Sequence, residues 1–360
     1  MPISAVDAVG PSFQHTKQQL TQPFRLAQWA KLALVGFLAG ELSSGGCNMS
    51  GFQIPTPTRS PSQHFAPSSG PLADPMLYAS LLAVLIVTGC IFFVLFLYLN
   101  SVMRFVLFDS VIQKTCEIRR GWERHHRHGL RYFVWQIFVL LATAVALVIL
   151  VGIPAGVGLA LGWLRDPKSH LAPLIVAGMM LFFVFLIFFI ALLTVHIFTK
   201  DFVIPQMALD DVSAIEGWRR LWPMLQTEKG AYAGYAGLKV AMALGAAAIV
   251  GIISSIVILV MLIPVGGVGA LVVLGGKAAG LDWNPYTITL AVVAVTTAVG
   301  LILYVISLIS VPAIIFFPAY SIYFYASRYP RLDALIHTPP PPLPYVPPAI
   351  EPLPPPRPAG

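Results

Sequence analysis

Residues 171–199 read LAPLIVAGMMLFFVFLIFFIALLTVHIFT, and this stretch decides the class of fold. Its 29 residues contain no Asp, Glu, Lys or Arg. The hydrocarbon core of a bilayer is crossed by about 20 apolar helical residues. Because backbone groups in lipid must bond within their own segment, a stretch of this kind is predicted to be a helix. The chain is therefore predicted to be an integral membrane protein.

Four further apolar stretches have the same character, at 77–98, 132–164, about 235–263 and about 288–310, the last continuing towards 326. Over the whole chain 57% of residues are hydrophobic and 10% are charged, against about 25% charged in ordinary soluble domains. This composition excludes a soluble globular protein. A shorter helix at 25–40 is expected to cross as well, the alternative being an amphipathic helix that lies in the interface. The prediction is an all-α helical membrane bundle with about six transmembrane helices.

The composition also divides the chain. Residues 1–24 form a polar segment, and 41–76 are rich in Ser, Gly and Pro, which predicts an exposed linker. Residues 77–327 form the polytopic membrane domain. The segment 328–360 is a proline-rich tail with twelve prolines after residue 338, so its end is expected to be extended. Its PxxPxR pattern at 352–357 offers a possible protein partner, although such tails are often plain spacers.

The placement of Lys and Arg predicts the orientation. If the helix at 25–40 crosses, eighteen of the 22 basic residues fall on one side. The positive-inside rule then puts both termini and both large polar loops in the cytoplasm of a bacterial cell. The net charge of +7 belongs to these loops, and with no soluble basic domain we expect no nucleic acid partner. Cys47, Cys90 and Cys116 fall in different kinds of segment, which argues against a disulfide framework.

Two parts of the membrane domain repeat in the same order. Repeat one is about 77–164 and repeat two about 171–280, followed by a final span at about 286–326. Phe105 precedes Trp122 by 17 residues, and Phe202 precedes Trp218 by 16. Each unit ends in an apolar run with glycines and one proline, Pro154 or Pro264, where we expect the helix to break. A third, truncated copy could begin at residue 311. Two spans per unit make the repeats parallel.

The second unit, residues 202–230 with Asp210-Asp211, Gly217-Trp218-Arg219-Arg220 and Lys229-Gly230, resembles the membrane domain associated with glycerophosphodiester phosphodiesterases. It is also similar to related uncharacterised bacterial polytopic membrane proteins, as is the aromatic ending at 317–325. The resemblance covers about residues 20–335, and its motifs are loose. The soluble phosphodiesterase domain is absent from the sequence, so the resemblance implies no catalytic activity here.

No motif of a nucleophile, a phosphate loop or a metal site occurs, so we expect no catalytic residue, cofactor or metal. His125, His126 and His128 are close in sequence, but metal binding is the weaker interpretation because no third ligand shares the face of His125 and His128. All fifteen acidic residues are expected outside the apolar cores, and Lys239 is expected to extend to the headgroups. Within the spans the remaining polar candidates are Gln136, Thr143, Thr194, His196, Ser254 and Ser255.

Two basic segments, each with a tryptophan, follow the first and third long spans. Lys and Arg near an anionic membrane surface contribute about 1 kcal/mol each. We therefore predict that lipid headgroups contact Arg119, Arg120, Trp122, Arg124, Arg127, Trp218, Arg219 and Arg220. The predicted function is a non-enzymatic membrane scaffold or accessory protein with membrane lipids as partners. The alternative is a small-molecule or lipid transporter with its site at the breaks beside Pro154 and Pro264. An intramembrane lipid enzyme is the least favoured hypothesis.

Overall fold

The structure is a computed structural model that describes residues 3–22, 24–41, 75–166, 168–278 and 285–336. In these ranges every regular element is helical. They are α1 (Val9–Thr21), α2 (Leu26–Leu38), α3 (Pro75–Gln113), α4 (Ile118–Ala160), α5 (Leu171–Phe198), the π-helical turn η4 (Thr199–Val203), α6 (Ile204–Asp210), α7 (Ala214–Thr227), α8 (Lys229–Ala278), α9 (Pro285–Ala326) and α10 (Pro330–Ile336).

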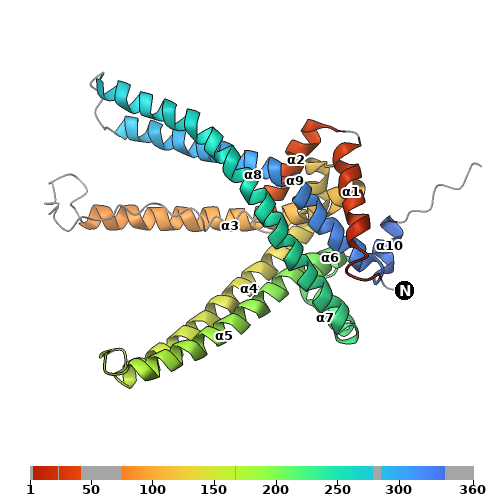
Figure 1. Cartoon of the computed structure of the whole chain (residues 1–360), viewed down its shortest axis with the longest axis horizontal. Helices are drawn as coiled ribbons and strands as arrows, with labels where there is room; N and C mark the ends of the chain where they lie inside the picture. The colour runs from red at the N-terminus through yellow and green to blue at the C-terminus, as the bar shows by residue number, and fades with distance from the viewer. Residues whose placement is uncertain (1–2, 23, 42–74, 167, 279–284, 337–360) are drawn as a thin grey trace, which may run out of the picture.

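The helices form one hub and three arms, as Figure 1 shows. We use "hub" for residues 3–41, 97–136, 198–242 and 306–336, where most buried side chains lie. One arm is the outer part of α3, the second is the α4–α5 hairpin, and the third is the α8–α9 hairpin. Both ends of the described chain lie in the hub, because the amide of Ile3 donates to Ser327 and Arg328 donates to the carbonyl of Ile3.

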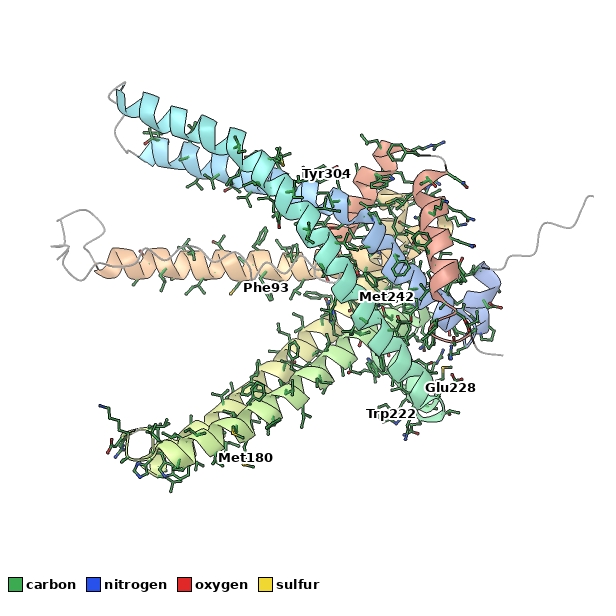
Figure 2. The ribbon with its side chains drawn as sticks, viewed as in Figure 1. Phe93, Met180, Trp222, Glu228, Met242 and Tyr304 are labelled. Atoms are coloured by element: carbon green, nitrogen blue, oxygen red, sulfur yellow. The ribbon has the colours of Figure 1, made fainter. Side chains whose placement is uncertain are left out.

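The arms are apolar and uncovered by protein. Five helical segments are long and apolar enough to cross a bilayer. In three of them, on α3, α4 and α5, no residue of the most apolar window is buried. Phe92 on α3 is 70% exposed and Val148 on α4 is 71% exposed, and Figure 2 shows such side chains pointing away from the arms. Lipid is the solvent that suits this surface, so the predicted all-α membrane architecture is confirmed.

The prediction that helix 25–40 crosses the membrane is wrong. The observed helix, α2, has 13 residues and a length of about 20 Å, too short for a core of about 30 Å. It packs inside the hub against α3 and α9, with Leu32, Ala33 and Val35 fully buried. Gly36 lies so close to Ile314 that an added Cβ would be 2.5 Å from its side chain. Within the described ranges, the long apolar spans number five.

The predicted helix breaks at Pro154 and Pro264 are also wrong. α4 continues through Pro154 to Ala160, and α8 continues through Pro264 to Ala278. A proline removes one backbone hydrogen bond, but a break would leave several polar groups facing lipid. Continuing the helix is therefore the less costly arrangement at this depth.

The two units share unusual local geometry in the hub. Lys114 and Asp211 have φ values of 56° and 55°, a left-handed conformation that non-glycine residues seldom adopt. Each stands nine residues after its phenylalanine, Phe105 or Phe202. In both units the glycine before the tryptophan packs on the valine after that phenylalanine, Gly121 on Val106 and Gly217 on Val203. The units then differ, since α4 runs on into the arm whereas α7 ends and α8 begins anew at Lys229.

Aromatic side chains fill the centre of the hub. Phe202, at 0% exposure, has ring contacts with Tyr232, Tyr235, Phe324 and Tyr325 at centroid distances from 5.1 to 6.1 Å. These rings come from η4, α8 and α9, three elements that meet here. Buried aromatic pairs contribute beyond their area alone, so this cluster fixes how α8 and α9 enter their arm.

Candidate functional site

The π-helical turn η4 carries two adjacent charged residues, Lys200 and Asp201, into the hub. It continues α5 and leads directly into α6, whose second residue is Pro205. A π turn accommodates one extra residue per turn and often marks a functional site. Here it places Asp201 at 2% exposure.

Asp201 is held by two side chains of α8. Lys239 Nζ lies 2.5 Å from Asp201 Oδ2, and the Tyr235 hydroxyl donates to the same oxygen at 2.9 Å. Lys239 is 6% exposed. Its predicted extension to the headgroups is therefore wrong, because a carboxylate inside the protein takes the place of the headgroup.

A second ion pair joins Lys200 to Glu41, just after α2. Glu41 is 3% exposed. The expectation that every acidic residue lies outside the apolar cores therefore fails at Glu41 and Asp201. In the sequence, Lys200 and Asp201 come at the end of the apolar stretch of α5, so Asp201 resembles the start of a loop. It is buried because α8 and α9 pack over it.

Arg104 on α3 lies beside these two pairs. Its Nε donates to the Ala39 carbonyl at 3.2 Å, and Nη1 donates to the Tyr132 hydroxyl at 2.9 Å. Arg104 is 8% exposed, and no carboxylate of a described residue lies within 4 Å of its nitrogens. We call Glu41, Arg104, Lys200, Asp201 and Lys239 the buried charge cluster; Lys200 is partly exposed and the other four are buried.

A small cavity adjoins the buried charge cluster. Its volume is about 30 Å³, and its polar lining comes from Glu41, Arg104, Lys200, Asp201 and Ser321. Leu107, Phe108 and Pro318 are among the apolar lining residues. A cavity needs about 10–15 Å³ to hold one water, so this one is too small for an organic substrate.

The predicted headgroup arginines lie at the hub surface, and most pair with neighbouring acids. Arg120 lies 2.8 Å from Glu117, and Arg124 lies 3.1 Å from Asp109. Arg119 pairs with Glu123, Arg219 with Glu216, and Arg220 with Glu216 and Asp210. Arg127 is exposed. Such exposed pairs contribute little, about 0–1 kcal/mol each, so the arginines can exchange partners.

The structure places both predicted tryptophans against the hub. Trp122 has an edge contact with Tyr98 at 6.0 Å, and the Trp218 indole N–H donates to Thr199 at 3.0 Å. The two basic segments are neighbours, since α4 contacts α7 and Arg131 donates to Asp211 at 2.7 Å. The arrangement therefore forms one basic surface from both units.

An exposed face of α7 was missed by the sequence reasoning. Ala214, Gly217 and Leu221 bury one side of this helix in the hub. The other side exposes Ile215 (69%), Trp222 (55%) and Arg219, and Figure 2 shows Trp222 at the rim of the hub. The spacing of Ile215, Arg219 and Trp222 at i, i+4 and i+7 is the signal that could have revealed this face.

The remaining polar candidates stay separate. Gln136 accepts a bond from Ser101 at 2.6 Å, and the hydroxyls of Thr194 and Ser255 bond to their own helices. Ser254 is buried, Thr143 half-buried and His196 exposed. His125 and His128 pack around Phe105, while His126 lies outside. Among the described residues, no three His, Cys, Asp or Glu side chains are placed to hold a metal ion.

Comparisons with known proteins give one match. No curated protein and no solved structure matches the chain. A family model matches residues 3–335, which include the hub, all three arms and the linker. The chain therefore belongs to the family of unknown function DUF7544.

Proposed function

We propose that the protein is a non-enzymatic scaffold of the bacterial cell membrane, whose hub rests on the headgroups of the cytoplasmic leaflet. The observation that carries the proposal is the exposed face of α7, which combines Ile215, Trp222 and Arg219 on a helix packed to the hub. An apolar and aromatic face with cationic residues is typical of helices that lie in the membrane interface.

The depth of the hub supports the proposal. The charges nearest the arms are Arg104, Arg131, Lys200 and Lys239. From these residues α3, α4, α5 and α8 each run outward without charge for at least 29 residues, or about 44 Å, and α9 contains no charged residue at all. A bilayer with its headgroups is about 40–45 Å thick. Arms that cross it fully therefore bring the hub to the level of the headgroups.

The distribution of Lys and Arg supports a cytoplasmic position of the hub. The hub carries most of the Lys and Arg residues, whereas the described tips of the arms carry Arg165, Lys168 and Lys277. By the positive-inside rule the hub, with both ends of the described chain, lies in the cytoplasm. Arg127 and the weakly held arginines of α4 and α7 then face anionic lipid. The matched turns at Lys114 and Asp211 support two parallel repeats, each supplying one basic helix to this surface.

The test is the depth of Trp222 in a membrane. A nitroxide is attached at Trp222→Cys after Cys47, Cys90 and Cys116 are replaced, and the full chain is reconstituted in phosphatidylglycerol–phosphatidylethanolamine vesicles. The matched control is Leu335→Cys on α10, also an exposed apolar position, at the hub end far from the arms. We expect the label at 222 to collide mainly with oxygen and the label at 335 mainly with a water-soluble nickel chelate. Equal exposure of both labels to the chelate would overturn the proposal.

A transporter remains the second candidate, favoured by the π turn and the buried charge cluster rather than by the prolines. Pro154 is exposed on an arm, and its helix is unbroken. Ion-coupled transporters use buried charges within the membrane, and Asp201 and Lys239 are buried charges at the hub ends of two spans. The cavity of about 30 Å³ limits such transport to small ions. Flux of a small ion into proteoliposomes, lost in Asp201→Asn, is the result that would favour transport over scaffolding.

A further inference from the structure

The buried charge cluster contains more positive than negative groups. Three bases, Arg104, Lys200 and Lys239, stand against two acids, Glu41 and Asp201. Lys239 pairs with Asp201 and Lys200 pairs with Glu41, which leaves Arg104 with uncharged partners among the described residues. Arg104 therefore carries a positive charge that no carboxylate of a described residue balances by direct contact.

A buried charge is costly unless a counterion accompanies it. The Ala39 carbonyl and the Tyr132 hydroxyl accept two of the five N–H donors of Arg104. They do not neutralise its charge. The side chain also lines the cavity of about 30 Å³, together with the two acids that already have ammonium partners. The cavity is therefore a place where a counterion would complete the charge balance.

We propose that this cavity binds one small monovalent inorganic anion of the size of chloride, held by the Arg104 guanidinium. The volume accommodates about two waters or one such ion, and it excludes a phosphate monoester or an organic acid. Ser321, which lines the cavity, offers a further polar group, although its hydroxyl bonds to the Pro318 carbonyl at 2.8 Å. Leu107, Phe108 and Pro318 form part of the apolar lining of the site.

The anion would connect elements that are far apart in sequence. Arg104 belongs to α3, Glu41 follows α2, and Lys200 and Asp201 belong to η4. These elements connect to two of the three arms and to the N-terminal helices. An anion at this point therefore stabilises the hub against opening, and its removal loosens the joint between α2, α3 and η4.

The direct test is binding of radioactive chloride to the full chain in a maltoside detergent without added lipid. Equilibrium dialysis is carried out at constant ionic strength with gluconate as the replacing anion, which is too large for the cavity. We expect saturable binding of about one chloride per chain, displaced by bromide and not by gluconate. Absence of saturable binding to the wild-type chain would overturn the proposal, because the cavity then holds water alone.

Arg104→Gln locates the site, with Arg165→Gln, an exposed arginine at the tip of the α4–α5 arm, as the matched control. We expect Arg104→Gln to weaken chloride binding at least tenfold and the control to leave it unchanged.

If Arg104→Gln does not fold, Leu107→Glu places a carboxylate one helical turn away as an internal counterion. This variant should fold with a thermal midpoint that no longer depends on chloride, whereas the midpoint of the wild-type chain rises with chloride. Unchanged chloride dependence in either variant, or protection by anionic lipid alone, would contradict the assignment.

Discussion

At the scale of single residues, Asp201 and Lys239 show what the sequence could and could not predict. The sequence predicts correctly that Lys239 lies near the polar end of an apolar helix, but it does not identify the partner of Lys239. Asp201 lies 38 positions away and looks like the start of a loop, because the run of apolar residues ends just before it. The pair forms through the packing of α8 on η4, which neither local pattern encodes. Buried partners of this kind are found only once the tertiary contacts are known.

The Asp201–Lys239 pair makes the first prediction. Asp201→Asn leaves the Lys239 ammonium buried without its carboxylate, which costs about 3–5 kcal/mol in comparable cases. We expect a large fall in the free energy of unfolding, measured by denaturant titration in detergent. The double variant Asp201→Asn with Lys239→Met removes the uncompensated charge and should recover most of that loss. If the double variant is as unstable as the single one, the pair does not act as a unit.

His15 makes a second prediction at this scale. The side chain is buried on α1, with Nε2 2.8 Å from the Val111 carbonyl and Nδ1 3.2 Å from the Tyr323 hydroxyl. Burial lowers the pKa of His15 below its usual value of 6.5. The unfolded chain therefore takes up the proton first as pH falls, and stability decreases from about pH 6.5 downward. Thermal unfolding at pH 7.5 and 5.5 should show this decrease, and His15→Gln should reduce it. An equal loss of stability in the wild-type chain and in His15→Gln would show that a group other than His15 causes it.

At the scale of elements, long uncharged stretches predicted the spans correctly because lipid leaves the backbone few alternatives to a helix. The same reasoning failed for α2. Its apolar residues face α3 and α9 instead of lipid, and a single sequence does not distinguish these two apolar environments. The exposed face of α7 could have been predicted from the spacing of Ile215, Arg219 and Trp222, but the prediction named Trp218 and not Trp222. Trp218 proved to be a packing residue with its indole N–H bonded to Thr199.

The contact between α3 and α4 makes the third prediction. A Cβ added at Gly129 would lie 2.9 Å from the Cα of Val102, a backbone atom that cannot move aside easily. We expect Gly129→Ala to lower the free energy of unfolding by about 1–3 kcal/mol through overpacking. Gly152 lies on the same helix with no atom within 4 Å of an added Cβ. Gly152→Ala should be neutral or stabilise by up to about 1 kcal/mol. Similar effects in both variants would argue against this helix contact.

The basic surface makes the fourth prediction. Arg127 and Arg219 are exposed on α4 and α7, and each should contribute about 1 kcal/mol to contact with anionic lipid. The double variant Arg127→Gln with Arg219→Gln should therefore lose about thirtyfold in preference for phosphatidylglycerol over phosphatidylcholine, measured with spin-labelled lipids. Lys17→Gln on α1 is the control and should keep the preference. An unchanged lipid preference in the double variant would show that this surface does not contact anionic lipid.

At the scale of the whole molecule, the protein is a polar hub that carries three bare apolar arms. The number of long spans and their helical nature followed from the sequence. The separation of the arms did not, because it depends on where the hub holds each helix. The cluster of Phe202, Tyr232, Tyr235 and Phe324 fixes α8 and α9 at one point, and the contact of α3 with α4 fixes another. The outer halves of these helices have apolar, exposed surfaces suited to contact with lipid.

The central claim is that the hub lies in the cytoplasm and the arms cross the membrane from it. The measurement is thiol labelling of intact cells with an impermeant maleimide, after the native cysteines have been replaced. Lys168→Cys reports the tip of the α4–α5 arm, and Gln226→Cys reports the hub on α7; both positions are exposed. We expect Lys168→Cys to be labelled in intact cells and Gln226→Cys only after lysis. Labelling of Gln226→Cys in intact cells, with Lys168→Cys protected, would contradict it.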